Sequence, residues 1–430
     1  MVLNIIRGHS AFHGEKNVKK VLTAALLVAA TAAHAQAPES DDLRALIEAQ
    51  QRQIELLQQQ LDATRASMAQ LAQQVEDNAQ ASSEANARAE ILADTMENQP
   101  VAAAPAVKLG GYGELHVNLL ENQLTGESDN MLDLHRFVLF LQHDFNDRLR
   151  FNSEVEIEHA LAGDGAPGEV ELEQAYVEYD WADNHSFKAG VFLLPVGILN
   201  ETHEPPTFYG VERNPVESRI IPTTWWEGGL AFTGGFGDAF RYDAAAHSGL
   251  FTTAEDGYAI RAGRQKTAKA RFDSQAYTGR LRWLGLPGLE VSASVQYQED
   301  ISQETDPLAG AAWLYTGHVA WRRGPFGLRA LYADWSLDGA GPEAVGADRQ
   351  AGWYVEPSWR FTEQWGVFAR YNQWDNQAGD RADSEYAQWD IGLNYWPHPD
   401  VVFKLDYQDQ DAPFGKKEMD GWNLGVGYQF

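Results

Sequence analysis

Apolar and polar side chains alternate with a period of two from residue 107 to the end of the chain, in about sixteen separate segments. In the segment 289–298 the odd-numbered residues are Leu, Val, Ala, Val and Tyr, and the even-numbered residues are Glu, Ser, Ser, Gln and Gln. Successive side chains of a β-strand point to opposite faces, so each segment predicts a strand with one apolar face and one polar face. The segments begin near residues 107, 132, 148, 169, 185, 225, 239, 275, 288, 313, 325, 350, 365, 387, 400 and 420.

These strands are predicted to form an all-β, sixteen-stranded antiparallel transmembrane barrel over residues 107–430. After residue 37 the chain has no run of about 18 apolar residues, which excludes a bundle of membrane helices. A β-barrel crosses lipid without such a run because only alternate residues face the acyl chains. The 14 Trp, 16 Tyr and 19 Phe suit aromatic girdles at two membrane interfaces. An aromatic-rich soluble β-sandwich is the alternative.

The connections between the segments alternate in length, as in outer-membrane barrels, and an even number of strands brings both ends to one side. The longest connection, about 195–224, is rich in Pro, Asn and Glu, and we expect it to fold into the lumen as a constriction loop. Short connections are expected at 146–147, 182–184, 237–238, 286–287, 323–324, 362–364 and 397–399, and other long ones at 123–131, 250–274, 300–312 and 337–349.

The composition excludes several kinds of site. Cysteine is absent, so the chain has no disulfide framework, thiolate metal site or cysteine nucleophile. The net charge of -29 argues against nucleic acid as a partner, because phosphate contacts need clustered Lys and Arg.

The N-terminal segment 1–35 is predicted to be a secretory signal peptide. Lys19 and Lys20 precede an apolar run at 21–33, and Ala33-His34-Ala35 forms an A-x-A cleavage site. The mature N-terminus is then 36–40. Residues 1–16 resemble an over-extended start, and a genuine leader extension is the alternative.

Residues 41–98 are predicted to form a periplasmic coiled coil. Apolar residues recur at heptad spacing, including Leu43, Leu57, Leu71 and Leu92 at one core position and Ile47, Ile54, Leu61 and Val75 at the other. A helix this polar has no core of its own, so the pattern implies self-association; a solvated single helix or a disordered stalk is the alternative. Residues 99–106 are a Pro- and Ala-containing linker.

The chain ends on an aromatic residue that closes an alternating strand. Phe430 follows Tyr428 and Val426 at alternate positions. This ending resembles the assembly signal of bacterial outer-membrane proteins. Together with the signal peptide, it predicts location in the outer membrane of a Gram-negative cell, with lipid around the barrel.

The long connection and its flanking strands carry a further resemblance. The run FKAGVFLLPVGILNETHEPPTFYGVERN, followed shortly by WWEGGLAFTGGFG, resembles the phosphate-selective porin O and P family. This resemblance implies sixteen-stranded barrels that assemble as homotrimers and pass small solutes. The matching residues are Gly190, Pro195, Gly197, Phe208, Arg213, Gly228 and Gly229.

The charges of the predicted barrel do not support carrying over phosphate selectivity. From residue 107 onward there are 25 Lys and Arg against 49 Asp and Glu, whereas anion selectivity needs rings of basic side chains. Opposing acidic and basic strips would set up a transverse field across the lumen. Residues expected on the lumen wall are Glu154, Glu156 and Glu158 on the acidic side and Arg280, Arg282, Arg360, Arg370 and Lys404 on the basic side.

The constriction loop supplies candidate groups for the pore eyelet. Glu212 and Arg213 together could shape the opening or form a salt bridge to the wall. The full candidate set is Glu201, His203, Glu204, Glu212, Arg213, Glu217 and Arg219.

Two kinds of chemistry were weighed against this interpretation. Glu201, His203 and Glu204 could bind a divalent cation, but a loop sequence E-x-H-E without a second histidine cluster favours a polar rim, so no metal site is expected. His247 and Ser248 invite comparison with outer-membrane phospholipases. Adjacent strand residues face opposite sides, so His247 could not activate Ser248.

The predicted function is passive diffusion of small hydrophilic solutes or ions through a weakly selective or cation-preferring pore, without catalysis or cofactor. The alternative is a structural outer-membrane anchor that tethers the envelope by contact between the coiled coil and the cell wall. Deletion of residues 41–98 would separate them, since only the anchor needs that segment.

Overall fold

The computed structural model describes residues 107–430 continuously and, before them, residues 61–70 with positions 51, 55, 58, 59, 73 and 76, all of which are helical. The signal segment 1–35, the mature N-terminus 36–40, most of the predicted coiled coil at 41–98 and the linker 99–106 lie outside the described residues. Those assignments stay predictions. Among the described residues, no helix combines the length and apolarity needed to span a membrane.

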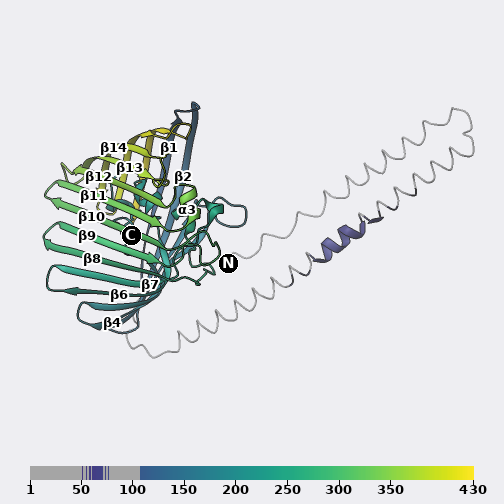
Figure 1. The fold of residues 1–430 in the computed structure, drawn as a ribbon, viewed down its shortest axis with the longest axis horizontal. Helices are drawn as coiled ribbons and strands as arrows, with labels where there is room; N and C mark the ends of the chain where they lie inside the picture. Colours follow the sequence, from purple (N-terminus) through teal and green to yellow (C-terminus); the bar gives the residue numbers. More distant parts are fainter. Residues whose placement is uncertain are drawn as a thin grey trace, which may run out of the picture. The chain divides into compact units, whose positions relative to one another are not determined.

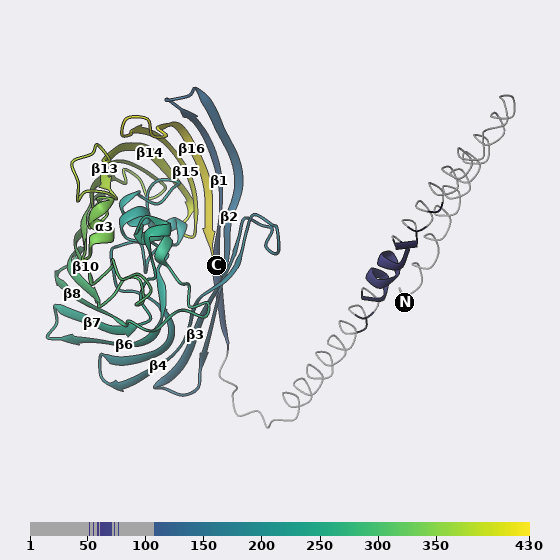
Figure 2. The same cartoon turned by 45° about the vertical axis from the view of Figure 1, so that its right-hand side comes forward.

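Within residues 107–430, sixteen antiparallel strands form one closed barrel (Figures 1 and 2). Each strand pairs with its neighbours in sequence, and β16 pairs with β1. The strands are β1 (Lys108–Asn122), β2 (Glu127–Asp144), β3 (Leu149–Glu158), β4 (Val170–Ala182), β5 (His185–Leu193), β6 (Trp226–Phe236), β7 (Phe240–His247), β8 (Ala276–Leu286), β9 (Leu289–Gln298), β10 (Ala312–Arg323), β11 (Phe326–Leu337), β12 (Arg349–Trp359), β13 (Trp365–Asp375), β14 (Tyr386–His398), β15 (Val401–Asp411) and β16 (Met419–Gln429).

The predicted barrel and its strand count are confirmed. All but one of the expected segments begin within one residue of an observed strand. The exception is β2, expected near residue 132, which starts at Glu127 because the hairpin with β1 continues to pair as far as Asn122. The connection expected at 123–131 is therefore reduced to 123–126.

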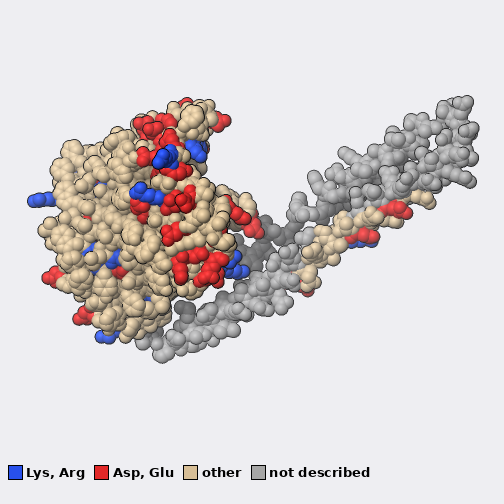
Figure 3. Space-filling view, in the orientation of Figure 1, with Lys and Arg blue, Asp and Glu red and all other residues tan. Residues whose placement is uncertain are grey.

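The burial pattern is that of a barrel surrounded by lipid. In β9 the outward Val291 and Val295 are 40% and 38% exposed, whereas the inward Ser294 and Gln296 are 6% and 0% exposed. Figure 3 shows the corresponding broad outer wall, which carries few charged side chains. A soluble β-sandwich would bury the apolar face instead, so that alternative does not fit.

This inside-out arrangement predicts opposite responses to charge on the two faces of one strand. Leu230 is 49% exposed near the middle of β6, and Thr233 of the same strand lines a polar cavity of the lumen. Leu230→Arg is expected to lower the free energy of unfolding by about 2–4 kcal/mol, since a charged side chain must enter the hydrocarbon layer. Urea unfolding in lipid vesicles checks this, with Thr233→Arg as the matched control. Equal losses in both variants would contradict the assignment of the two faces.

The C-terminal residue lies at the seam that closes the barrel. Phe430 N donates to Gly111 O at 2.9 Å, and Gly111 N donates to Phe430 O at 3.0 Å. The Phe430 ring stacks on Phe137 of β2 at a centroid distance of 6.3 Å. The terminal aromatic therefore extends the last strand pair and touches the next strand across the seam.

The apolar core of the protein lies inside the barrel. Residues 194–225, which we call the inward loop, join β5 to β6 and contain the short helices η1 (Pro205–Thr207) and η2 (Val216–Ile220). Figure 2 shows this teal segment within the ring of strands. The buried cluster combines Val216, Ile220, Ile221 and Trp225 of the inward loop with Leu314, Leu331, Trp335, Tyr354 and Trp374 of β10–β13, and with Leu250, Tyr258, Ile260 and Ile301 of neighbouring loops.

The remaining short helices belong to the long loops. These are η3 (Ala254–Asp256) and η4 (Ile260–Gly263), which lie between β7 and β8, and α3 (Ala340–Ala344), which lies between β11 and β12.

Candidate pore constriction

The inward loop crosses the lumen. It leaves the wall at β5, yet η2 contacts β11, β12 and β13, and η1 contacts β15, β16 and β1. Of these strands, β11, β12, β13, β15 and β16 lie on the other side of the closed sheet from β5 and β6. A segment that touches both sides must narrow the opening between them.

A buried carboxylate holds the loop in shape. Glu217 is 0% exposed, and its Oε1 accepts the backbone N–H of Ile198 at 2.5 Å and of Leu199 at 2.7 Å. Its Oε2 accepts the hydroxyl of Tyr354 at 2.9 Å and the amide of Asn214 at 3.1 Å. This position differs from the eyelet role expected for Glu217, since the carboxylate faces the interior of the loop.

The turn that presents those N–H groups requires glycine. Gly197 has a φ of +74°, a conformation that side chains with a Cβ rarely adopt. A Cβ at this position would also lie 2.5 Å from Glu217 Oε1. The Pro-x-Gly step of the sequence therefore forms the turn whose N–H groups bind the Glu217 carboxylate.

Basic side chains of the far wall bind the loop backbone. Lys404 of β15 donates to Gly210 O at 2.8 Å and lies 3.5 Å from the centroid of the Phe208 ring. Arg370 of β13 donates to Tyr209 O at 3.4 Å. Asp406 accepts the N–H of Val211 at 2.7 Å. Lys404 and Arg370 therefore face the lumen, and their charges bind the inward loop to the wall.

Arg370 also neutralises two buried carboxylates. It lies 3.0 Å from Asp390 of β14 and 3.2 Å from Glu356 of β12. All three side chains are at most 4% exposed. This triad is a structural element of the wall.

The part of the wall formed by β1 and β3 is acidic. Glu154 and Glu156 of β3 are each 1% exposed, and Glu114 of β1 is 3% exposed. Arg136 of β2 lies 2.8 Å from Glu114 and 3.6 Å from Glu156. Glu114 and Glu156 thus share the guanidinium of Arg136, whereas Glu154 forms no ion pair with it.

Glu212 of the inward loop meets this acidic side. Its Oε1 lies 3.1 Å from His116 Nδ1 and accepts the amide of Asn118 at 3.0 Å, both from β1. Burial works against ionisation of Glu212, but the attraction of His116 and these hydrogen bonds outweigh it and lower the pKa to about 2. The ionised carboxylate is paired with His116, and its side chain is still 41% exposed.

The other loop candidates have varied surroundings. Arg213 Nη1 donates to Thr224 Oγ1 of the same loop at 2.8 Å. Arg219 is exposed, and its carbonyl accepts the amide of Asn376 at 3.3 Å. Glu204 is half-buried at the start of η1. His203 is 3% exposed and lies beside Glu154 and Glu173.

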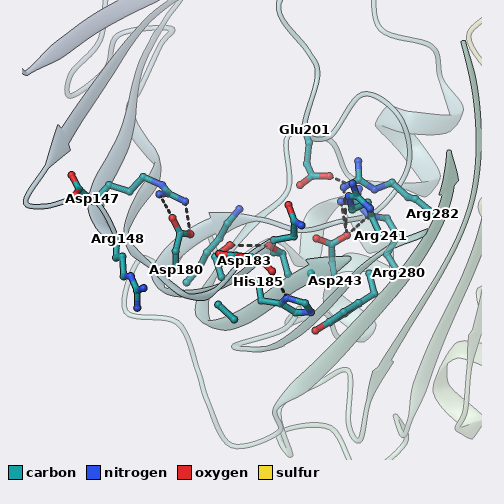
Figure 4. A pocket seen from close by; sticks show the side chains of 18 of the residues that line it. Asp147, Arg148, Asp180, Asp183, His185, Glu201, Arg241, Asp243, Arg280 and Arg282 are labelled. Atoms are coloured by element: carbon teal, nitrogen blue, oxygen red, sulfur yellow. Dashed lines mark hydrogen bonds and ion pairs between the residues drawn. The ribbon is translucent and has the colours of Figure 1, made fainter. Parts of the chain in front are cut away.

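Glu201 faces a cavity of about 760 Å³ at the short-turn end of the lumen, which we call the vestibule cavity. It forms an ion pair with Arg280 of β8, which also donates to Asp243 at 2.8 Å. Arg282 lies 4.0 Å from Asp243. Figure 4 shows Glu201 reaching toward this cluster. The charged residues of the lining are Asp147, Arg148, Arg150, Asp180, Asp183, Lys188, Glu201, Arg241, Asp243, Arg280 and Arg282.

Two predicted wall residues lie near the ends of strands. Arg360 follows β12, donates to Glu363 O at 3.0 Å and stacks over the Trp396 ring at 4.2 Å. Its charge therefore serves the short turn, and its side chain also lines, with Tyr209 and Trp396, a cavity between the inward loop and the wall. Glu158 ends β3 and approaches Glu169 and Glu171.

His247 and Ser248 have separate partners. His247 Nε2 lies 2.8 Å from Thr278 Oγ1, and Ser248 donates to Glu227. The pair is not arranged as a nucleophile and its base.

Sequence reasoning missed several charged or polar residues of the lumen. Glu114, His116 and Asn118 alternate along β1 and could have been identified by that spacing. Arg136 directly follows His135 in β2, and Asp243 lies two residues after Arg241 in β7. Only the pairing of neighbouring strands reveals their partners.

The closed barrel with an inward loop is similar to solved porin structures. The outer membrane channel DcaP of Acinetobacter baumannii has a TM-score of 0.55 at 15% identity, covering 77% of this chain and 99% of that one. The anion-selective porin from Comamonas acidovorans has a TM-score of 0.52 at 12% identity, covering 76% and 99%. The Salmonella typhi OmpF complex with daunomycin has a TM-score of 0.54 at 14% identity, covering 75% and 97%. At these identities the likeness shows the fold.

Sequence comparison identifies the family. A protein of Aquifex aeolicus (strain VF5), named only as an uncharacterized protein, is 31% identical over 366 residues, which cover 75% of this chain and 80% of that protein. The family described as phosphate-selective porin O and P matches residues 107–413, nearly the whole barrel. The chain therefore belongs to the phosphate-selective porin O and P family.

Proposed function

We propose that this outer-membrane porin passes small hydrophilic solutes and ions down their gradients, with a weak preference for cations. The observation that carries the preference is the charge of three consecutive long loops, 299–311, 338–348 and 376–385. Together they contain ten Asp and Glu and one Arg. In Figure 3 acidic side chains gather on the rim beside α3, which belongs to the middle loop. Such a rim raises the local concentration of cations.

The charges inside the lumen support weak selectivity. Arg370, Lys404 and Arg280 are engaged with loop carbonyls or carboxylates. The vestibule cavity has six Lys and Arg against five Asp and Glu, so its walls are nearly balanced. The anion selectivity named for the Comamonas acidovorans porin belongs to that protein.

Neutralising the acidic rim is expected to remove most of the cation preference. The variant Glu304→Gln, Glu343→Gln, Asp383→Asn, Glu385→Gln changes four exposed side chains, and the permeability ratio of potassium to chloride should fall toward one. Reversal potentials across planar bilayers under a potassium chloride gradient measure it. The charge-conserving variant Glu304→Asp, Glu343→Asp, Asp383→Glu, Glu385→Asp is the control. A clear preference for chloride or phosphate in the wild-type protein would contradict the proposal.

We also propose a homotrimer. The solved relative OmpT of Vibrio cholerae is described in a trimer form, and its fold is shared by this chain. Mass measurement of the detergent-solubilised protein by light scattering tests the proposal. The proposed tether to the cell wall depends on residues 41–98, most of which lie outside the described residues.

A further inference from the structure

Three potential ligand atoms converge where the inward loop first meets the acidic wall. His203 Nε2 lies 3.5 Å from Glu154 Oε1 of β3 and 3.8 Å from Glu173 Oε2 of β4. All three atoms lie within 4.8 Å of one another. The residues are 3%, 1% and 2% exposed, respectively. Burial of two carboxylates this close together needs a compensating positive charge.

A β-bulge turns Glu173 toward this point. In the register of β3 with β4, Glu154 pairs with Gln174 and Val155 pairs with Leu172, so Glu173 is the extra residue. A bulge places two successive residues opposite one residue of the partner strand and redirects a side chain. Without it, Glu173 and Gln174 would point to opposite faces, yet Glu173 is buried and Gln174 bonds the lumen-facing Glu154.

The three converging atoms have no hydrogen-bond partner among the described residues. The other atoms of two of the groups are already held. His203 Nδ1 donates to Asn200 O at 3.2 Å, and Glu154 Oε2 accepts the amide of Gln174 at 2.6 Å. A carbonyl can only accept, so Nδ1 carries the proton and the Nε2 lone pair is left for another ligand. Histidine ligands of metals are commonly oriented by such a carbonyl.

The distances match the spacing of ligands around an ion. A hydrogen bond between an imidazolium and a carboxylate is about 2.7–2.9 Å long, which is shorter than the 3.5 and 3.8 Å observed. Two ligands that each lie about 2.1 Å from a cation, at a tetrahedral angle, are roughly 3.4 Å apart. The cluster is thus too open for a hydrogen bond and close to the size of a coordination sphere.

We propose that Glu154, Glu173 and His203 bind one divalent transition-metal cation of the zinc, cobalt or manganese class. The two carboxylates balance its charge, and imidazole with carboxylate oxygens suits these ions. Because His203 belongs to the inward loop and the carboxylates belong to β3 and β4, the cation joins the loop to the wall. The Tyr112 ring packs edge-on against the imidazole at 5.8 Å and limits its rotation.

The other two groupings of potential ligands among the described residues are already satisfied. Asp133 Oδ2 lies 2.8 Å from His159 Nδ1 and 3.3 Å from His135 Nδ1. Lys266 lies 2.9 Å from Glu169 and also forms an ion pair with Glu171, beside Glu158. The loop sequence E-x-H-E thus supplies only its histidine, and the carboxylates come from the wall.

Cobalt(II) titration of the full-length protein in detergent, stripped beforehand with EDTA, tests the site. Visible absorption bands of protein-bound cobalt are expected to saturate at one ion per chain and to disappear when zinc is added. His203→Ala should abolish the bands, and Glu173→Gln should weaken cobalt binding at least about tenfold. Zinc should raise the unfolding temperature of the wild-type barrel and leave that of His203→Ala unchanged.

Two controls locate the cation. Glu204→Gln, on the same loop, and Asp133→Asn, in another cluster, are expected to bind cobalt as the wild type does. If His203→Ala fails to fold, Glu173→Gln keeps the side-chain volume and still removes a ligand. Absence of stoichiometric binding by folded wild-type protein, binding that survives in His203→Ala and Glu173→Gln, or binding lost in Asp133→Asn would overturn the proposal.

Discussion

Replacing Glu217 by alanine is expected to release the inward loop and give a larger, noisier single-channel conductance. The change leaves three buried donors and one part-buried donor without their acceptor, and two of these four are the N–H groups of Ile198 and Leu199. Each buried donor left unpaired costs about 1–3 kcal/mol, and allowing for relaxation the loop should lose roughly 3–5 kcal/mol of its anchoring. That loss favours local opening of the loop by roughly two to four orders of magnitude.

Planar-bilayer recording measures the effect directly. Glu255→Ala removes an exposed carboxylate from the loop between β7 and β8 and should leave the conductance unchanged. Tyr354→Phe removes one of the four donors, so its effect should be intermediate. Identical conductance in Glu217→Ala and the wild type would show that this carboxylate does not position the loop.

Replacing Arg370 by methionine is expected to lower the free energy of unfolding by about 3–5 kcal/mol, since removal of one partner leaves buried charges uncompensated. Glu356 and Asp390 would then face each other inside the wall at 4% and 3% side-chain exposure. The loop would also lose the donor to Tyr209 O. Urea unfolding of the barrel in lipid vesicles provides the measurement.

A second substitution separates charge from packing. The double variant Arg370→Met, Asp390→Asn removes one of the two unpaired carboxylates, so part of the lost free energy of unfolding should be recovered. Arg323→Met, at the exposed end of β10, is the matched control and should change stability by less than about 0.5 kcal/mol. No recovery in the double variant would indicate that Arg370 acts by its volume and loop contact alone.

The sequence predicted the barrel well because the polarity pattern of each strand depends on the local surroundings of that strand alone. Alternation along 289–298 depends only on which face meets lipid, and this is decided residue by residue. The same logic led us to expect Glu154 and Glu156 on the lumen wall, and both side chains are buried among the residues that meet the inward loop. It also located the connection at 195–224, within one residue at each end of the inward loop.

The roles of the loop residues could not be predicted in the same way. Glu217 was expected at the eyelet, but its partners Ile198, Leu199 and Tyr354 are distant in sequence and meet only when the loop is docked. Likewise, the apolar residues around η2 form a core with β10–β13 that has no local signature. Contacts between a loop and a wall far along the chain depend on the closed barrel.

The cluster around His203 shows the same limit more sharply. The loop sequence suggested Glu201 and Glu204 as companions of this histidine, because they are its neighbours in the chain. The structure instead pairs Glu201 with Arg280 and places His203 beside Glu154 and Glu173. A bulge in β4 makes that arrangement possible. The extra residue of β4 does not change the alternation of β3, so the sequence of β3 gives no sign of it.

Single-channel conductance of the purified full-length protein in planar bilayers tests the central claim most directly, that this barrel is an open channel narrowed by its inward loop. We expect discrete steps of uniform size in symmetrical potassium chloride, with a reversal potential displaced toward that of potassium when a gradient is imposed. Absence of steps from protein whose β-sheet content is verified by circular dichroism would contradict the account.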